Sequence, residues 1–584
     1  MTESLQTFIG LSALVLFYFV VGRVVATHTL FGRYFASSIL FNVLSAFSIW
    51  FLAALVALFL GVSLDVMWWV YVAVCAAGLV FSWAFRRDAL PSEHSFTLPF
   101  VSCLFLIPVF FFVWADVPVQ MHELLVDYPL FESLNAGAVG AVAPVNGNLT
   151  VGLFLYPLST FLSGYDAVFA LFNVLLLAMV ADAMIKVTNL QVRWSNLPLL
   201  AVGALMGLCV LNPFMNLESL ASFNSDLLFA AVLLTVVTPL CREKPLPYGY
   251  GIFPIAALLG VLAAGFGAAG YLMSIVAVVV YVLRSLVDDK RWFDSIFGNV
   301  VVVCVPLMAH AIYGLLWGQA TIVSAEIYTL NVFEILWLVL LLLVFVVQFM
   351  STRANFLEDL LVRQSWLMVP VIFVAVGVAD LYLGQHRITP EHYQFLALVP
   401  VWFLATSWYQ GSKWRSLAYD HPWVLALGLG VVFVSFSTLY ADSLTQRHDD
   451  PSQHTLLIAK DMQESYVAKG DSIAVLEHGV HDIEGYYSAM LKHGLKGHQA
   501  PVLNVDELFR KSVNDMGLFH MALMNNNFQY LWLHTPVEED RAWVGRYLKV
   551  DRSYLFEVTS KGLRLIQVYP HPSYTYYSLS KPAD

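Results

Sequence analysis

The residues that could do chemistry lie in three polar segments, each of which borders a long apolar run. Asp116 opens the segment WADVPVQMHELLVDYPL directly after the run 97–115. Asp226 closes the segment LNPFMNLESLASFNSD where another run begins. Arg387 belongs to the third segment, LGQHRITPEHYQFLALVP. A carboxylate can take a proton from an attacking hydroxyl, and an arginine can hold a phosphate through paired charge-assisted hydrogen bonds.

The two carboxylates also have a structural interpretation. Asp116 could cap a helix that starts at Pro118, and Asp226 could cap the apolar run that it precedes. Apolar residues from Val119 to Leu130 are spaced for an amphipathic helix on the membrane surface, which would hold Asp116 at headgroup height. Three further polar residues of this segment are candidates for substrate binding, or for a merely solvated loop: His122, Glu123 and Asp127.

Arg387 stands out because it is flanked by His386 and His392 and followed by Tyr393. We predict that Arg387, helped by His386 or His392, binds a substrate phosphate, and that Tyr393 belongs to the same substrate-binding site. The alternative is an ion pair of Arg387 with a nearby acidic residue or a contact with a lipid headgroup.

The composition requires these segments to be positioned by membrane helices. The 584-residue chain is 59% hydrophobic and only 12% charged, whereas soluble domains contain about 25% charged residues. A mean hydropathy of +0.71 agrees. An ordinary soluble enzyme is excluded, and a net charge of −11 gives no sign of nucleic-acid binding.

Apolar runs long enough to cross a bilayer predict a polytopic α-helical membrane protein with about fourteen transmembrane helices. The runs are 6–26, 36–61, 65–85, 97–115, 164–186, 196–215, 225–241, 252–268, 270–287, 296–318, 330–350, 366–383, 393–409 and 421–440. The region 252–287 could instead be one long kinked span. With two spans there and the N-terminus outside, every Lys and Arg before residue 442 except Arg387 falls in an inner loop. This asymmetry favours two spans and puts the C-terminal region on the extracytoplasmic side.

The region 441–584 has the composition of a soluble domain. Ser472–Glu477 and Phe528–His534 read as strands, 483–492 and 538–547 as helices, and 553–558 with 563–569 as a hairpin turned at Lys561–Gly562. This alternation predicts a small α/β domain. Two histidines and an aspartate at 478–482 could suggest a metal site, but a solvated loop is the better interpretation of such scattered residues.

Together these features resemble the GT-C superfamily of polytopic membrane glycosyltransferases, which take sugars from polyprenyl-phosphate carriers. The resemblance rests on the Asp116 segment with GNLTVGLFLYPLSTFLSGYD, on FNSDLLFAAVLL, and on HRITPEHYQFLALVPVWFLA. It implies a membrane catalytic domain over 97–440, preceded by a three-helix segment over 1–96 and followed by the extracytoplasmic domain over 441–584. The family's acidic pair, Asp-x-Asp or Glu-x-Asp, is absent, so no metal ligand is assigned and a divalent cation stays an open alternative.

The resemblance implies an inverting hexosyl or pentosyl transfer. The partners would be a polyprenyl-phosphate sugar donor, a glycan or lipid acceptor and membrane lipids, at a bacterial inner (plasma) membrane during assembly of cell-envelope glycans. Asp116 would be the general base, with Asp226 as the second candidate, and Arg387 with His386 or His392 would stabilise the leaving phosphate. The alternatives are a lipid or glycan transporter (flippase), an O-antigen-type ligase or polymerase, and a non-catalytic scaffold.

Overall fold

The computed structural model describes two compact units, which we treat separately. The helical unit comprises Met1–Val117 and Pro129–Tyr440, and the tail unit comprises Pro118–Tyr128 and Ala441–Asp584. The described residues are 2–28, 38–85, 128–135, 137, 144, 147–159, 166–187, 225–237, 252–287, 292–318, 451–477, 486–495, 501–512, 516–534 and 552–570.

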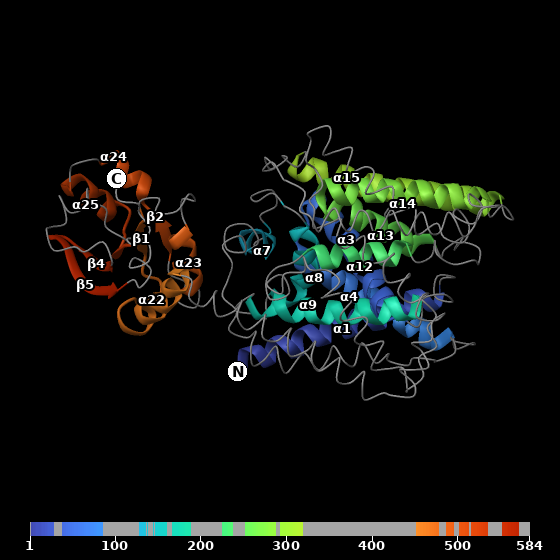
Figure 1. Cartoon of the computed structure of the whole chain (residues 1–584), viewed down its shortest axis with the longest axis horizontal. Coiled ribbons are helices and arrows are strands. Elements are labelled where there is room, and N and C mark those ends of the chain that lie inside the picture. The colour runs from blue at the N-terminus through green and yellow to red at the C-terminus, as the bar shows by residue number, and fades with distance from the viewer. Residues whose placement is uncertain are drawn as a thin grey trace, which may run out of the picture. The chain divides into compact units, whose positions relative to one another are not determined.

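The described residues are mostly helical (Figure 1). In the helical unit they form α1 (Thr2–His28), α3 (Ile39–Leu60), α4 (Leu64–Phe85), α7 (Tyr128–Asn135), α8 (Asn148–Ser159), α9 (Asp166–Val187), α12 (Asp226–Val237), α13 (Phe253–Gly265), α14 (Gly267–Val287) and α15 (Trp292–Trp317).

Four of these helices contain stretches long and apolar enough to cross a membrane. The stretches are Gln6–Val25, Ile39–Leu60, Leu64–Ala84 and Ile296–Trp317, and each coincides with a predicted span. Helices α9, α12, α13 and α14 lie on four further predicted spans but contain shorter apolar stretches. These helices fit an integral membrane protein. The predicted spans at 97–115, 196–215 and between 330 and 440 lie outside the described residues, so the total of fourteen stays a prediction.

Helix α3 forms the centre of the described helical unit. Its aromatic residues Phe47, Trp50 and Phe51 are fully buried. Helix α1 reaches it closely because Gly22, which has no side chain, lies against the backbone of Asn42. Such close approach through small residues is typical of helix packing in membranes.

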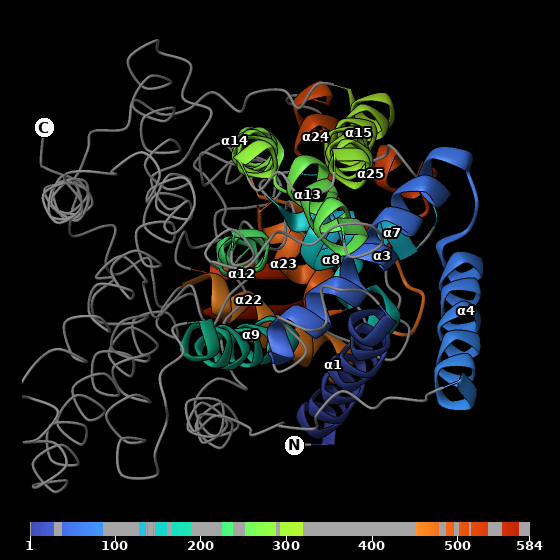
Figure 2. The same ribbon diagram turned by 90° about the vertical axis from the view of Figure 1, so that its right-hand side faces the viewer.

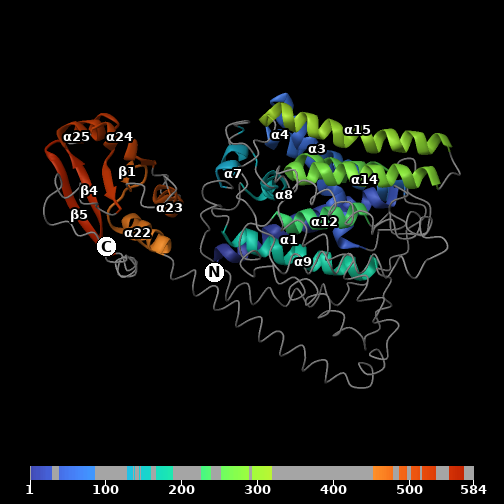
Figure 3. The same cartoon turned by 45° about the horizontal axis from the view of Figure 1, so that its top comes forward.

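The region 252–287 is two helices, α13 and α14, and not one kinked span. The chain turns at Phe266 and Gly267, where Gly267 has a φ of +62°. The hydroxyl of Ser274 donates to the carbonyl of Leu259 across 3.2 Å, and Gly270 lies against the carbonyl of Leu262. These contacts pair residues placed symmetrically about the turn, so the helices are antiparallel. α15 follows and packs beside both helices, and Figure 3 shows it running alongside α14.

Helix α8 lies between the predicted spans 97–115 and 164–186, where the sequence predicted no helix after Leu130. It packs against α1, α3 and α13 inside the helical unit (Figure 2). Asn148 and Thr150 are fully buried, although their Asn-Leu-Thr sequence resembles a surface glycosylation site. The polar start and Pro157 favour a loop in sequence terms, but Pro157 lies inside the helix. The segment nevertheless forms a helix because most of its apolar side chains, such as Leu153 and Phe154, are buried against the neighbouring helices.

The tail unit contains a five-stranded sheet with helices on both faces (Figure 1). Its elements are α22 (Pro451–Ser465), β1 (Ile473–Leu476), α23 (Tyr486–Gly494), β2 (Val502–Asn504), α24 (Asp506–Lys511), α25 (Met516–Asn525), β3 (Tyr530–Leu533), β4 (Arg552–Thr559) and β5 (Gly562–Pro570). The strand order is β2-β1-β3-β4-β5. β1, β2 and β3 are parallel, whereas β4 and β5 pair antiparallel.

Alternating strand residues pack against different helices. Leu476, Leu531 and Phe556 share one core with Phe519 and Leu523 of α25. The opposite face lies under α22 and α23, and there the hydroxyl of Tyr569 donates to Asp461 of α22 across 2.9 Å.

The strands and hairpin predicted in this region are confirmed as β1, β3, β4 and β5. The helix predicted over 483–492 is observed as α23. The helix predicted over 538–547 lies outside the described residues.

Candidate functional site

Three helices of the helical unit begin within one small cluster of residues. Gly147 precedes α8, Ser225 precedes α12, and Phe266 precedes α14. A Cβ atom added to Gly147 would lie 2.7 Å from Cβ of Ser225 and 2.8 Å from Cδ1 of Phe266. Only a residue without a side chain allows this approach, and Gly147 also has a φ of +86°, which favours glycine. We call these three residues with Thr150 and Gly265 the α8 junction.

A hydrogen bond between helices holds the α8 junction together. The hydroxyl of Thr150 donates to the carbonyl of Gly265 across 2.8 Å. This carbonyl lies in the last turn of α13, where helix carbonyls have no partner within the helix. The junction thus ties the start of α8 to the end of α13.

The electrostatics of the α8 junction favour negative charge. Three helices present their first backbone N–H groups there, and the N-terminus of a helix carries a partial positive charge. Asp226 is the first residue of α12, directly after Ser225. The sequence-predicted second carboxylate therefore begins its helix beside the start of α8.

The other sequence-predicted site residues lie outside the described residues. They are Asp116, His122, Glu123, Asp127, His386, Arg387, His392 and Tyr393. Their roles stay predictions. The structure does describe Gly147, the first residue of GNLTVGLFLYPLSTFLSGYD, and Ser225, the residue before Asp226, and it brings these two together.

A third carboxylate of this region was missed by sequence reasoning. Asp65 lies in the first turn of α4 and accepts a hydrogen bond of 2.8 Å from the hydroxyl of Tyr156 in α8. By the predicted orientation it lies at the outer end of a span, as do Asp116 and Asp226. That shared position was the signal that could have identified it. Helix α8 thus has Asp226 near its start and Asp65 beside its last turn.

His310 of α15 has a structural role in the described helices. Its Nδ1 lies 3.1 Å from the carbonyl oxygen of Ala263, and its ring stacks on Tyr271 with 3.8 Å between centroids. A histidine bonded to a helix carbonyl and covered by a ring supports packing between α13, α14 and α15.

The tail unit has a second polar cluster at the carboxyl ends of its parallel strands. Glu477 follows β1 and is buried. Its carboxylate accepts hydrogen bonds from the backbone N–H groups of Tyr487 at 2.7 Å and Ser488 at 3.3 Å, and from the side chains of Ser488 and Asn504. Its own N–H donates to Asp506 across 2.8 Å. We call these five residues the Glu477 cluster.

The location of the Glu477 cluster has a chemical consequence. β1 lies between β2 and β3, and the crevice at such a reversal of strand order is where doubly wound sheets bind ligands, often anions at a helix N-terminus. Here the chain's own carboxylate occupies the N-terminus of α23. The cluster therefore closes this edge of the sheet with an internal anion.

Burial raises the pKa of Glu477 above its ordinary value, and the negative charge of Asp506 acts in the same direction. The hydrogen bonds from Asn504, Tyr487 and Ser488 oppose the rise in pKa because they stabilise the carboxylate.

Within the described part of the chain, no three His, Cys, Asp or Glu residues are grouped so that they could hold a metal ion. His478, His481 and Asp482 lie outside the described residues.

Comparison with protein-family models and with curated proteins finds no match for this chain. The functional interpretation therefore rests on the residues and on the geometry above.

Proposed function

We propose that this protein is a membrane glycosyltransferase that transfers a sugar from a polyprenyl-phosphate donor to an acceptor hydroxyl. The proposal includes about fourteen spans of GT-C-like arrangement, a bacterial inner membrane, and a reaction on the extracytoplasmic face, where the tail unit also lies. The observation that carries it is the approach of Gly147 to Ser225. Gly147 begins GNLTVGLFLYPLSTFLSGYD, and Ser225 directly precedes Asp226 in FNSDLLFAAVLL, so the approach joins two of the sequence stretches on which the resemblance to GT-C enzymes rests.

The reaction follows from the chemistry of a glycosyl phosphate. The acceptor oxygen attacks the anomeric carbon while the bond from that carbon to the phosphate oxygen breaks. A carboxylate accepts the hydroxyl proton as the new bond forms, and Asp116 is assigned this role, with Asp226 as the second candidate. The departing lipid phosphate carries the negative charge, so no general acid is required.

The leaving phosphate needs positive charge beside it in the transition state. Arg387, with His386 or His392, is assigned this role. His122, Glu123, Asp127 and Tyr393 are assigned to substrate binding, and the helix starts at the α8 junction add partial positive charge near Asp226.

Transfer from radiolabelled polyprenyl-phosphate sugars in liposomes tests the proposal. The wild type is compared with Asp116→Asn, Asp226→Asn and Arg387→Ala, and Asp471→Asn in the tail unit is the matched control. Asp471 caps a turn by accepting from the N–H of Ala468 across 2.9 Å. Loss of the base is expected to lower the rate on the order of a hundredfold or more, while Asp471→Asn keeps full rate.

The outcomes separate the class from the residue roles. If Asp116→Asn is active and Asp226→Asn is not, the base is Asp226. If both carboxylate variants keep full rate, the assigned base is wrong although the class stands. If the wild type consumes no donor in a broad panel of sugars and carriers, the glycosyltransferase proposal fails.

A further inference from the structure

Helix α25 of the tail unit is apolar on two sides. Phe519 and Leu523 are buried in the core of the unit. On the outer side, Leu518 is 57% exposed, Met521 58% and Met524 40%. Their spacing of three residues puts them along one side of the helix. Single exposed apolar residues are common on proteins, but a row of three on a ten-residue helix is typical of an interaction surface.

The same face of the sheet carries another exposed apolar residue. Leu565 of β5 is 48% exposed and pairs with Phe556 of β4. Phe556 belongs to the core that α25 covers. The apolar surface therefore includes the edge of the sheet beside α25.

Basic residues flank α25 at two places. Arg510 and Lys511 form the last turn of α24, and α24 contacts α25 through the rings of Phe509 and Phe519, whose centroids are 5.2 Å apart. On the other flank, Nε2 of His520 lies 2.7 Å from the carbonyl oxygen of Thr559. This contact holds α25 against the turn between β4 and β5.

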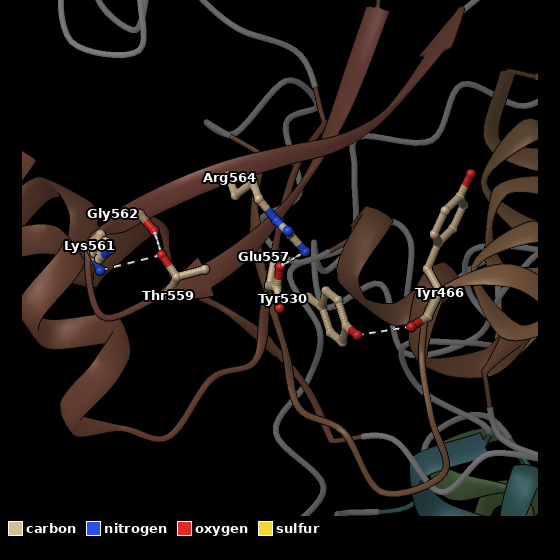
Figure 4. A network of polar contacts seen from close by, with 7 residues as sticks. All are labelled: Tyr466, Tyr530, Glu557, Thr559, Lys561, Gly562 and Arg564. Atoms are coloured by element: carbon tan, nitrogen blue, oxygen red, sulfur yellow. Dashed lines mark hydrogen bonds and ion pairs between the residues drawn. The ribbon is translucent and has the colours of Figure 1, made fainter.

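The turn between β4 and β5 carries Lys561, whereas Arg564 lies within β5 beside Glu557, on the face of the sheet opposite α25 (Figure 4). Arg564 pairs with Glu557, and on α24 Lys511 pairs with Glu507 across 2.6 Å. Among the described residues of α24 and of the β4–β5 turn, Arg510, Lys511 and Lys561 are basic and Glu507 is the exposed acidic residue. The described flanks of the apolar row therefore carry a positive excess.

We propose that α25 and its basic flanks form a docking surface for an anionic lipid bilayer. An apolar helix face bordered by Lys and Arg is the pattern of an interfacial helix, in which apolar side chains enter the headgroup region and cations meet anionic lipids. The bilayer is the partner at the highest local concentration, because the same chain contains helices of spanning length. This inference does not depend on the glycosyltransferase proposal.

Photo-crosslinking of the full-length protein tests the inference. A diazirine amino acid replaces Met521 in one variant and Leu457 in another, and both are reconstituted in nanodiscs that contain phosphatidylglycerol. Leu457 is the matched control because it is 63% exposed and belongs to α22, on the opposite face of the sheet. Both positions are exposed, so neither replacement disturbs the core.

We expect lipid adducts at position 521 and several-fold fewer at position 457, with the yield at 521 lower in nanodiscs of phosphatidylcholine alone. Equal lipid yields at the two positions would overturn the inference. Adducts from 521 mainly to protein, whether to the same chain or to a second copy, would also overturn it and identify a protein contact instead. Hydrogen exchange of β1 and β3 verifies that each variant is folded.

Discussion

The α8 junction and the Glu477 cluster solve the same problem with different chemistry. In both, the first turn of a helix is buried, so its backbone N–H groups need acceptors other than water. At α8 the N–H of Thr150 donates to the carbonyl of Gly147 across 3.0 Å, in a bond of the 3₁₀ type. At α23 the N–H groups of Tyr487 and Ser488 donate to the carboxylate of Glu477.

The difference follows from how costly a buried charge is in each unit. A charged group inside a bundle of apolar helices is costly, so the described contacts at the α8 junction use glycines, a hydroxyl and carbonyls. The tail unit holds a carboxylate because four hydrogen bonds from three residues compensate its burial. The first solution depends on shape and the second on charge. Substitutions should therefore affect them differently.

The largest effect is expected for Glu477→Ala. The variant leaves the N–H groups of Tyr487 and Ser488 and the amide of Asn504 without an acceptor, and each buried unsatisfied donor costs about 1–3 kcal/mol. We expect a loss of about 4 kcal/mol in the free energy of opening of the sheet, measured by hydrogen exchange of β1 and β3.

Glu507→Ala is the matched control for Glu477→Ala. Glu507 is exposed and its ion pair with Lys511 is solvated, so its removal should change the opening free energy by less than about 0.5 kcal/mol. Equal effects of the two substitutions would show that the Glu477 cluster does not stabilise the sheet.

The second-largest loss of stability is expected for Gly147→Ala, which tests the close packing at the α8 junction. Gly147→Ala adds a Cβ that overlaps Ser225 and Phe266 and also strains a residue with a φ of +86°. We expect a loss of about 3 kcal/mol in unfolding free energy of the helical unit in detergent.

Gly137→Ala separates the two causes of this loss. Gly137 has a similar φ of +66° but no atom within 4 Å of an added Cβ, so only the backbone strain of about 1 kcal/mol remains. If both alanine variants lose the same stability, the close packing at the α8 junction contributes nothing.

Much of the fold could be predicted from sequence periodicity. Apolar runs identified the helices of the helical unit, and alternating residues identified β1, β3 and the β4–β5 hairpin. The strand β2 and the helices α22, α24 and α25 were not predicted. β2 and α24 have only three and six residues, which contain too little periodicity. α8 was also not predicted, and its burial depends on contacts with α1, α3 and α13 that no local pattern contains.

The candidate site was predicted less completely than the fold. Asp226 was identified because it stands where an apolar run begins, and the structure starts α12 there. Asp65 has the same local signature, yet its bond to Tyr156 joins residues 91 positions apart. Glu477 was read as the end of a strand, and its four hydrogen bonds come from residues beyond the next loop. Such contacts form only when the chain is folded.

A smaller effect tests the hydrogen bond at the α8 junction. Thr150→Val keeps the shape but removes the bond to the carbonyl of Gly265, which should cost about 1 kcal/mol in the helical unit. Thr235→Val is the control, since the hydroxyl of Thr235 bonds within its own helix to the carbonyl of Ala231 across 2.8 Å. The carbonyl of Ala231 still accepts its backbone hydrogen bond within the helix, so this variant should lose almost no stability. A comparable loss of stability in both variants would mean that the bond between helices contributes no more than a bond within one helix.

The last prediction concerns pH and decides whether burial or hydrogen bonding dominates the pKa of Glu477. Its pKa in the folded protein is raised above the ordinary value of 4.5. The folded state therefore holds this proton more tightly than the unfolded state, and the resulting stabilisation is complete below pH 4.5 and is lost as pH rises through the raised pKa. We expect the opening free energy of wild type, relative to Glu477→Gln, to fall with a slope of at most about 1.4 kcal/mol per pH unit. Hydrogen exchange of β3, corrected for the intrinsic pH dependence of exchange, measures both proteins. A relative stability that instead rises with pH would mean that the hydrogen bonds from α23 and Asn504 outweigh desolvation, so that the Glu477 cluster favours the carboxylate despite its burial.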